Sequence, residues 1–402
     1  MNDKQSLALD LVKQGGNVFI TGSAGTGKSF CIERIADFLE ENNKRFTVAA
    51  TTGCAAVQIG GTTLHSWAGI GLGSKNTRSN IRKIIERGKL DMWRSIDTLI
   101  IDEVSMLDFE YFKHLMNVAK DIRNSKKPFG GIQLVFVGDF CQLGPIKKSF
   151  IFEQESMWKE LNLKTVELTD IIRQKDEEFV NILQKLRLGE CSDADKETLM
   201  KKKKFDSNGI SPTKIRSTNK QVDFINKREL DKMSKDNKIY EYTASYSDVD
   251  SKQHFTDITP DILEICIGCQ VMVTYNVDII NGVINGTRGI VTECFPSYVN
   301  IKLLNGMTIP IEKVKFTVEQ NGKTHTKTQL PLKLAYAISI HKCQGMTIDY
   351  MEVDLGSSIF CHGQTYTAVS RARTIEGLII TNFNTKRIIC DDKVLDFYKN
   401  LN

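Results

Sequence analysis

The sequence lacks the long apolar segments and terminal signals of membrane and secreted proteins. No apolar run approaches the ~20 residues that a membrane-spanning helix needs. The N-terminal stretch MNDKQSLALD has no basic segment followed by an apolar one, unlike a signal peptide. We therefore expect an intracellular protein of the cytoplasm or nucleus, with no membrane partner and no targeting segment.

The sequence also lacks the two closely spaced cysteine pairs of a typical zinc site. The chain has 10 cysteines, which without a signal peptide indicates reduced thiols in a reducing compartment. Its C-x-x-C sequence, Cys266 to Cys269, is not followed by another pair at the spacing of a zinc site. We interpret these two residues as small buried or half-buried thiols that enter a strand.

Positive charges only slightly outnumber negative ones. The net charge is +5, and 26% of the residues are charged and 41% hydrophobic, as in globular proteins. A mildly basic chain is compatible with a polyanionic partner but does not identify one. No internal repeat or low-complexity linker interrupts the 402 residues.

Short apolar runs alternate with helical patterns in the first part of the chain, residues 1–167. Such runs suit a parallel sheet that is covered on both faces, and helical stretches such as SFCIERIADFLEENN supply the crossovers. They predict a doubly wound α/β lobe with ligands at the carboxyl ends of the strands. The expected strands are NVFITG, FTVAATT, TLIIDE and QLVFVGD.

Two stretches depart from this rhythm. Residues 69–95 are polar, which predicts a small insertion in the first lobe. Residues from about 268 to 330 contain short strands separated by Gly and Asn turns, which predicts an inserted β-module. Because the α/β pattern returns afterwards, we predict an α/β protein of two lobes, residues 1–167 and 168–402.

The strongest motif is GSAGTGKS, which fits G-x-x-x-x-G-K-[ST] and lies between an expected strand and helix. Its glycines allow backbone N–H groups to approach phosphate oxygens, and the helix N-terminus adds partial positive charge. Lys28 reaches the terminal phosphates and the Ser29 hydroxyl reaches Mg²⁺. The nucleotide-binding residues predicted here are Gly22, Ala24, Gly25, Thr26, Gly27, Lys28 and Ser29.

Acidic and polar residues follow two further strands. Asp102 and Glu103 end the strand LIIDE, where one carboxylate holds Mg²⁺ and the next polarises the attacking water. We assign Asp102 to the metal and Glu103 to the base. Gln142 follows the strand LVFVGD, where its amide can contact the γ-phosphate or the water. Arg173 and Arg371 are candidates for stabilising charge on the γ-oxygens, although composition alone favours surface arginines.

These motifs occur in one order, and together they resemble the PIF-type (petite-integration-frequency) DNA helicases of superfamily 1, relatives of the RecD helicases. The resemblance runs from Gln5 to about Thr381. The motifs that carry it are GSAGTGKS, AATTGCAAVQIGGTTLHSWAGIG, LIIDEVSMLD, VGDFCQLGP, ELTDIIRQ, NGTRG, QLPLKLAYAISIHKCQGMT and YTAVSRARTIEGL.

The resemblance implies two RecA-like lobes, a wedge in the first at about 69–95 and an SH3-like barrel in the second at about 268–330. It implies a motor that uses ATP and Mg²⁺ to move 5′ to 3′ on single-stranded DNA and to unwind forked or tailed duplexes. We also expect a monomer that works with replication or single-strand-binding proteins. We expect a role in replication, recombination or repair, together with telomere maintenance.

Individual residues match the family's functional positions. Gln5 matches the residue that reads the adenine edge, Arg173 and Arg371 match the two arginine fingers, and Gln344 with Gly345 matches a loop that contacts nucleotide and DNA. The matched DNA contacts are Thr52, His65 and Trp67 in the first lobe and His341 and Lys342 in the second.

Three positions depart from the family pattern. Ile172 stands where an aromatic residue often precedes the finger arginine, which removes adenine stacking from that position. Trp67 replaces a common Phe and keeps a stacking surface. Cys343 replaces a common Ser and removes a hydroxyl contact.

Several alternatives stay open at this point. An RNA helicase, or a nucleic-acid-stimulated ATPase that does not separate strands, would carry the same motifs. A P-loop kinase or metabolic ATPase leaves the HKCQG loop and the paired arginines unexplained, and an inactive binding protein would not need the complete catalytic set. For His65 and Trp67, a core pair that closes a helix is the alternative to DNA contact.

Overall fold

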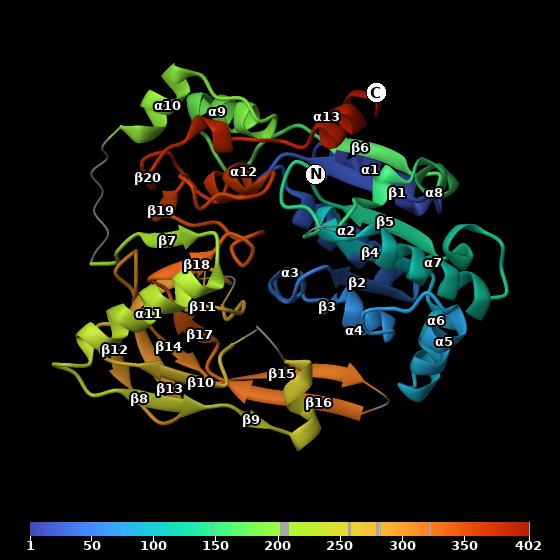
Figure 1. Cartoon of the computed structure of the whole chain (residues 1–402). Helices are drawn as coiled ribbons and strands as arrows, with labels where there is room; N and C mark the ends of the chain where they lie inside the picture. Colours follow the sequence, from blue (N-terminus) through green and yellow to red (C-terminus); the bar gives the residue numbers. More distant parts are fainter. Residues whose placement is uncertain are drawn as a thin grey trace. The chain divides into compact units, whose positions relative to one another are not determined.

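The computed structural model describes residues 1–146, 148–201, 209–255, 259–278, 281, 283–320 and 323–401. The chain divides into two compact units, each described by itself below (Figure 1). The first unit is Met1–Arg173 with Glu319–Thr324 and Cys390–Asn402. The second unit is Gln174–Val318 with His325–Ile389.

A parallel sheet forms the centre of the first unit. Its described strands are β1 (Val18–Gly22), β2 (Phe46–Ala50), β3 (Thr62–Thr63), β4 (Thr98–Asp102), β5 (Gln133–Val137) and β6 (Lys164–Leu168). Their order across the sheet is β3-β2-β4-β5-β1-β6, and each registered pair is parallel. β1 and β4 are buried along their whole length, because helices cover both faces of the sheet. The predicted doubly wound α/β lobe is confirmed.

Helices connect these strands. The described ones are α1 (Asp3–Lys13), α2 (Lys28–Glu41), α3 (Gly53–Gln58), α4 (Leu64–Ala68), α7 (Phe109–Ile122) and α8 (Glu155–Glu160). The buried face of α2 includes Ile32 and Ile35, which pack in one core cluster with Ile20 of β1 and Val135 of β5. This packing fixes the start of α2, and with it the phosphate loop, against the centre of the sheet.

Two helices occupy the stretch predicted as an insertion, α5 (Thr77–Glu86) and α6 (Leu90–Ser95). Both are anchored to the core of the lobe. Ile84 of α5 and Trp93 of α6 are fully buried, and the Trp93 indole nitrogen donates a hydrogen bond to the Ala68 carbonyl at 3.1 Å. Residues 69–95 therefore share apolar contacts with the lobe, although their sequence is mostly polar.

The C-terminal helix α13 (Asp392–Lys399) packs on the first unit, beside its blue and green elements in Figure 1. Phe397 stacks on Phe152 with ring centroids 4.2 Å apart and contacts Phe140 at 5.3 Å. The sequence-based boundary placed 168–402 in one lobe. The structure instead groups 168–173 and Cys390–Asn402 with the first unit, because the aromatic face of α13 is buried there.

The second unit contains its own parallel sheet. Its described strands are β7 (Thr213–Arg216), β18 (Ala337–Ser339), β19 (Met351–Asp354) and β20 (Leu378–Thr381), in the order β18-β7-β19-β20. Its described helices are α9 (Glu177–Arg187), α10 (Asp193–Met200), α11 (Asn219–Met233) and α12 (Gln364–Val369). This is the second α/β lobe that the sequence predicts.

An antiparallel β-module is inserted in the chain between β7 and β18 of this sheet. Its main described strands are β11 (Gln270–Val273), β12 (Arg288–Cys294), β13 (Tyr298–Leu303), β14 (Thr308–Glu312) and β17 (Leu332–Leu334), in the order β14-β13-β12-β11-β17. Further pairs join β8 (Tyr240–Thr243) to β10 (Ile262–Ile265) and β9 (Ser245–Tyr246) to β16 (Lys323–Gln329), beside β15 (Val314–Gln320). The module thus extends beyond the predicted 268–330, because Tyr242 and Leu263 share its core.

Cys266 and Cys269 are buried in the core of this module, as predicted. Within the described ranges, no cluster of three or more His, Cys, Asp or Glu side chains is arranged to hold a metal ion. No described helix combines the length and apolar character needed to cross a membrane.

Candidate nucleotide site and nucleic-acid interface

The phosphate loop requires glycine at its two ends. Gly22 and Gly27 have φ values of 137° and 84°, which L side chains rarely adopt. A Cβ at Gly22 would lie 2.3 Å from the Leu168 carbonyl oxygen of β6. A Cβ at Gly27 would lie 2.8 Å from Gln5 Nε2 and 3.2 Å from Ile172 Cδ1. The glycines therefore let α1 and the segment after β6 approach the loop.

Lys28 lies in the concave side of this loop. Its Nζ donates hydrogen bonds to the carbonyls of Gly22 at 2.7 Å and Ser23 at 2.9 Å. The Thr26 hydroxyl also donates to the Ser23 carbonyl at 2.9 Å. Ser29 is exposed in the first turn of α2, next to Lys28. The ammonium group and the serine hydroxyl thus lie at the start of α2, where the motif predicts phosphate and Mg²⁺ binding.

Asp102 and Glu103 end β4 and are almost completely buried. Asp102 Oδ1 accepts a hydrogen bond from the Glu103 backbone N–H at 2.8 Å. Burial, and then the nearby Glu103 charge, raise the pKa of Asp102 to about 7 against the opposing effects of that hydrogen bond and of Lys28. A divalent cation would reverse this effect, and buried carboxylate plus serine hydroxyl is an oxygen donor set that suits Mg²⁺.

Glu103 has a left-handed backbone, with φ of 52°. For a residue other than glycine this conformation costs about 1–3 kcal/mol and is concentrated at functional sites. The Thr51 hydroxyl, at the end of β2, donates to the Glu103 carbonyl at 3.0 Å and helps hold the turn. The strained turn fixes the Glu103 carboxyl group just beyond the strand end.

The Gln142 loop follows β5, which lies between β1 and β4 in the sheet. Because all these strands are parallel, the phosphate loop, Asp102–Glu103 and Gln142 leave the same edge of the sheet. The Gly138 N–H donates to the Ile20 carbonyl of β1 at 3.1 Å, and the Gln142 N–H donates to the Asp139 carbonyl at 3.0 Å. Gln142 itself is buried.

Gln5 borders the phosphate loop from α1 and is 3% exposed. Its Oε1 accepts from the Asn2 N–H at 3.1 Å in a capping box, whereas its Nε2 has no partner among the described residues. A buried donor without a partner is costly, so a ligand with an acceptor atom would satisfy it. Ile172, 61% exposed, and Arg173 both donate backbone N–H groups to the Gly25 carbonyl, at 2.8 and 3.2 Å.

Arg371, Gln344 and Gly345 belong to the second unit. The Arg371 guanidinium is buried at the end of α12, where Nε donates to the Thr367 carbonyl and Nη2 to the Ser370 hydroxyl, both at 2.9 Å. Gln344 is buried in the loop that Gly345 turns with a φ of 80°. Their predicted approach to the nucleotide stays a prediction.

Of the three predicted DNA contacts in the first unit, Thr52 and His65 are at least partly exposed, whereas Trp67 is buried. Thr52 is half-buried and its Oγ1 accepts from the Ala55 N–H at 3.2 Å, at the start of α3. His65 is exposed and its ring stacks on Tyr111 at 4.2 Å. Desolvation lowers the pKa of His65, which favours the neutral ring.

The prediction of a DNA-stacking surface at Trp67 is corrected by the structure. Trp67 is 2% exposed, and its ring centroid lies 4.5 Å from that of Trp93. The stretch predicted as a polar insertion supplies Trp93, which covers the Trp67 indole. Trp67 is therefore a core residue of the first unit, the alternative that the sequence left open.

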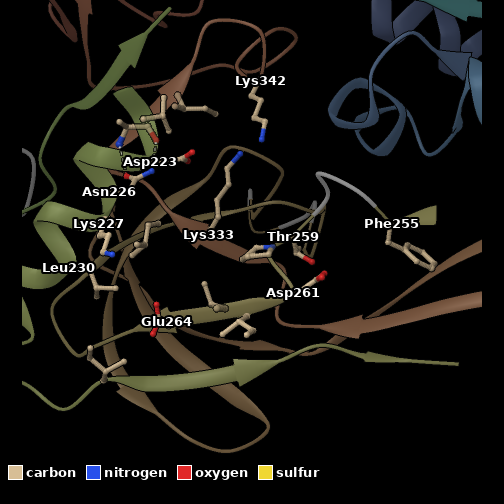
Figure 2. A pocket seen from close by; sticks show the side chains of 18 of the residues that line it. Asp223, Asn226, Lys227, Leu230, Phe255, Thr259, Asp261, Glu264, Lys333 and Lys342 are labelled. Carbon is tan, nitrogen blue, oxygen red and sulfur yellow. Dashed lines mark hydrogen bonds between the residues drawn. The ribbon is translucent and has the colours of Figure 1, made fainter. Parts of the chain in front are cut away.

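A cavity of about 1270 Å³ in the second unit includes Lys342 in its lining, together with residues of α11, β10, β17 and β18. Figure 2 shows Lys342 and Lys333 of β17 pointing toward one another at one end of it. Carboxylates such as Asp223 and Asp261 also line the cavity. The sequence motifs did not single out Lys333 as a cavity residue. The one feature that could have done so is a cation within the apolar run LPLKLAYA. His341 is half-buried, and burial lowers its pKa.

Comparison with known proteins identifies the relatives of this arrangement. A family model described as PIF1-like helicase matches residues 1–197. The crystal structure of Pif1 helicase from Candida albicans is 35% identical, covers 100% of this chain and 99% of its own, and superposes with a TM-score of 0.84. This chain belongs to the PIF1-like helicase family.

Other PIF1-like helicases extend this similarity. The human ATP-dependent DNA helicase PIF1 is 38% identical over all of this chain, which spans 64% of that relative's length. Bacteroides Pif1, in a structure bound to single-stranded DNA, is 30% identical with a TM-score of 0.70, and the match covers 99% of this chain and 96% of that one. The predicted family and its fold of two RecA-like lobes are thereby confirmed.

The predicted site residues of this PIF1-like chain fall into two groups. The first unit itself brings together the phosphate loop, Gln5, Asp102, Glu103 and Gln142, with the backbone of Arg173 tied to the loop. The second unit holds Gln344, Gly345 and Arg371 with His341 and Lys342.

Proposed function

We propose that this PIF1-like protein is an ATP-dependent DNA helicase that moves 5′ to 3′ along single-stranded DNA and unwinds forked or tailed duplexes, as a monomer. The observation that carries the proposal is the first unit's sheet edge, where the phosphate loop, the buried Asp102–Glu103 pair and the Gln142 loop converge. Similarity along the whole of this chain to proteins named as DNA helicases, of which it spans 64%, supports the substrate class. The process served is replication, recombination or repair, including telomere maintenance.

In this proposal the residues divide the work of ATP hydrolysis. Lys28 and the loop N–H groups bind the β- and γ-phosphates, and the unpartnered Gln5 Nε2 donates to the adenine edge. Asp102 and Ser29 hold Mg²⁺, which neutralises phosphate charge when bound. Glu103 accepts the proton of the attacking water.

Three more side chains complete the reaction centre. Gln142 orients the attacking water, and Arg173 and Arg371 stabilise the charge that develops on the γ-oxygens. Arginines in this role contribute about 10³–10⁵ in rate in related chemistry. Closure of the two lobes on single-stranded DNA brings Arg371 to the nucleotide, which makes hydrolysis depend on DNA.

In this proposal, hydrogen-bond donors from both units hold the single-stranded DNA. Thr52 and His65 serve the first unit, and His341, Lys342 and Lys333 serve the second through the phosphate backbone. Gln344 and Gly345 lie on the loop that links nucleotide state to DNA grip. Residues 69–95 act as the wedge at the fork, and the β-module braces the strand or the duplex.

The test measures ATP hydrolysis with and without single-stranded DNA, and strand separation on duplexes with a 5′ or a 3′ tail. We expect strong DNA stimulation and unwinding of the 5′-tailed duplex only. Unwinding of the 3′-tailed duplex alone would refute the polarity. Equal stimulation by RNA, or stimulation without strand separation, would replace the DNA-helicase proposal by an RNA helicase or a translocating ATPase.

A further inference from the structure

One tyrosine of the C-terminal helix reaches the strand end that carries the phosphate loop. The Tyr398 hydroxyl lies 2.7 Å from Thr21 Oγ1, 3.1 Å from the Phe140 backbone nitrogen and 3.2 Å from Asp139 Oδ1. Thr21 directly precedes Gly22 of the loop, and Asp139 and Phe140 directly precede Cys141 and Gln142. Thr21, Phe140 and Asp139 are all buried in the first unit.

The donors and acceptors around this hydroxyl are complementary. The tyrosine oxygen accepts from the Phe140 N–H, and the tyrosine O–H donates to Asp139 Oδ1. The remaining lone pair accepts the Thr21 hydroxyl proton. A single hydroxyl group therefore joins β1 to the turn after β5.

The same carboxylate shapes the Gln142 loop. Asp139 Oδ1 also accepts from the Cys141 N–H at 3.1 Å, and the Asp139 carbonyl accepts from the Gln142 N–H at 3.0 Å. The tyrosine is held in place by its neighbour Phe397, whose ring stacks on Phe152. A change at the tyrosine hydroxyl would thus reach Gln142 through one residue.

We propose that Tyr398 is a positioning residue, which holds the Gln142 loop in register with the phosphate loop and so sets the rate of ATP hydrolysis rather than the affinity for ATP. This inference rests on the proposed role of Gln142. It assigns a function in hydrolysis to a helix whose Tyr398 lies 258 residues after Phe140 in the sequence. The hydroxyl acts through Asp139 and does not touch the nucleotide.

The test uses the full chain with Tyr398→Phe, which keeps the ring and removes the hydroxyl. The matched control is Tyr298→Phe in β13, where the ring stacks on Phe295. We expect kcat for DNA-stimulated ATP hydrolysis to fall about tenfold in Tyr398→Phe, because the lost hydrogen bonds no longer hold the Gln142 loop in place. KM for ATP and single-stranded DNA affinity should stay within about twofold. The control should keep the parental kcat.

A double-mutant cycle with Gln142→Ala shows whether Tyr398 acts by positioning Gln142 or by stabilising the fold in general. In the Gln142→Ala background, Tyr398→Phe should change kcat little, because its route to the reaction is already removed. An equal loss of kcat in both backgrounds, an unchanged kcat in Tyr398→Phe, or a weakened binding of a fluorescent ATP analogue would each overturn the inference. A parental protein without DNA-stimulated ATPase would instead reject the proposed function.

Discussion

Replacing Trp67 by alanine tests whether this side chain stabilises the core of the first unit or contacts DNA. The side chain is 2% exposed and packs 4.5 Å from Trp93, which is itself fully buried. Replacing a buried tryptophan by alanine costs about 3–5 kcal/mol in the free energy of unfolding, because the lost transfer energy adds to that of the cavity. At ~2–4 °C per kcal/mol for a unit of this size, Trp67→Ala should lower the melting temperature by about 10 °C.

Trp67→Phe is the informative partner of this variant. The Trp67 indole nitrogen is buried and has no hydrogen-bond partner among the described residues, a situation that costs about 1–3 kcal/mol. Phenylalanine keeps most of the packing and removes the unsatisfied N–H. We therefore expect Trp67→Phe to unfold close to the parental temperature.

The assays are thermal unfolding followed by far-ultraviolet circular dichroism and binding of a labelled single-stranded oligonucleotide by fluorescence anisotropy. Binding is measured well below the melting temperature, where both variants are folded, and DNA affinity should match the parent. A stacked base is worth ~1–3 kcal/mol, so a real contact at Trp67 would weaken binding about 5- to 150-fold in Trp67→Ala. That loss with an unchanged melting temperature would refute the core assignment.

Three further predictions concern the catalytic pair and the strand contacts. Glu103→Gln should keep ATP binding and slow hydrolysis by about 10²–10⁴-fold, and a parental rate would show that another group is the base. The raised pKa of Asp102 means that protons compete with Mg²⁺, so the Mg²⁺ concentration for half-maximal hydrolysis should rise as the pH falls from about 8 to about 6; a constant value would contradict the buried ligand. Lys333→Gln should weaken single-stranded DNA binding and lower its salt dependence by about 0.7 in log–log slope, whereas Lys232→Gln, on the exposed side of α11, should change neither.

The sequence by itself determined the parts of the site that are contiguous in the chain. Gly22 to Ser29 form the phosphate loop because glycines, lysine and serine act within one turn between β1 and α2, and no distant partner is needed to specify it. The apolar run before Asp102 predicts a buried strand, and parallel pairing then places its end beside the phosphate loop. Ordered motifs were also sufficient to predict the family.

Burial and partnership were decided only by the tertiary structure, because they depend on residues far away in the chain. Whether Trp67 faces DNA or the core depends on Trp93, which lies in a stretch whose polar composition predicted an insertion. The presence of Lys333 and Lys342 at one end of the cavity depends on how β17 and the following loop fold around it. The link from Tyr398 to Asp139 exists because the last helix returns to the first sheet, and no local pattern of residues near position 398 specifies which sheet its aromatic face will cover.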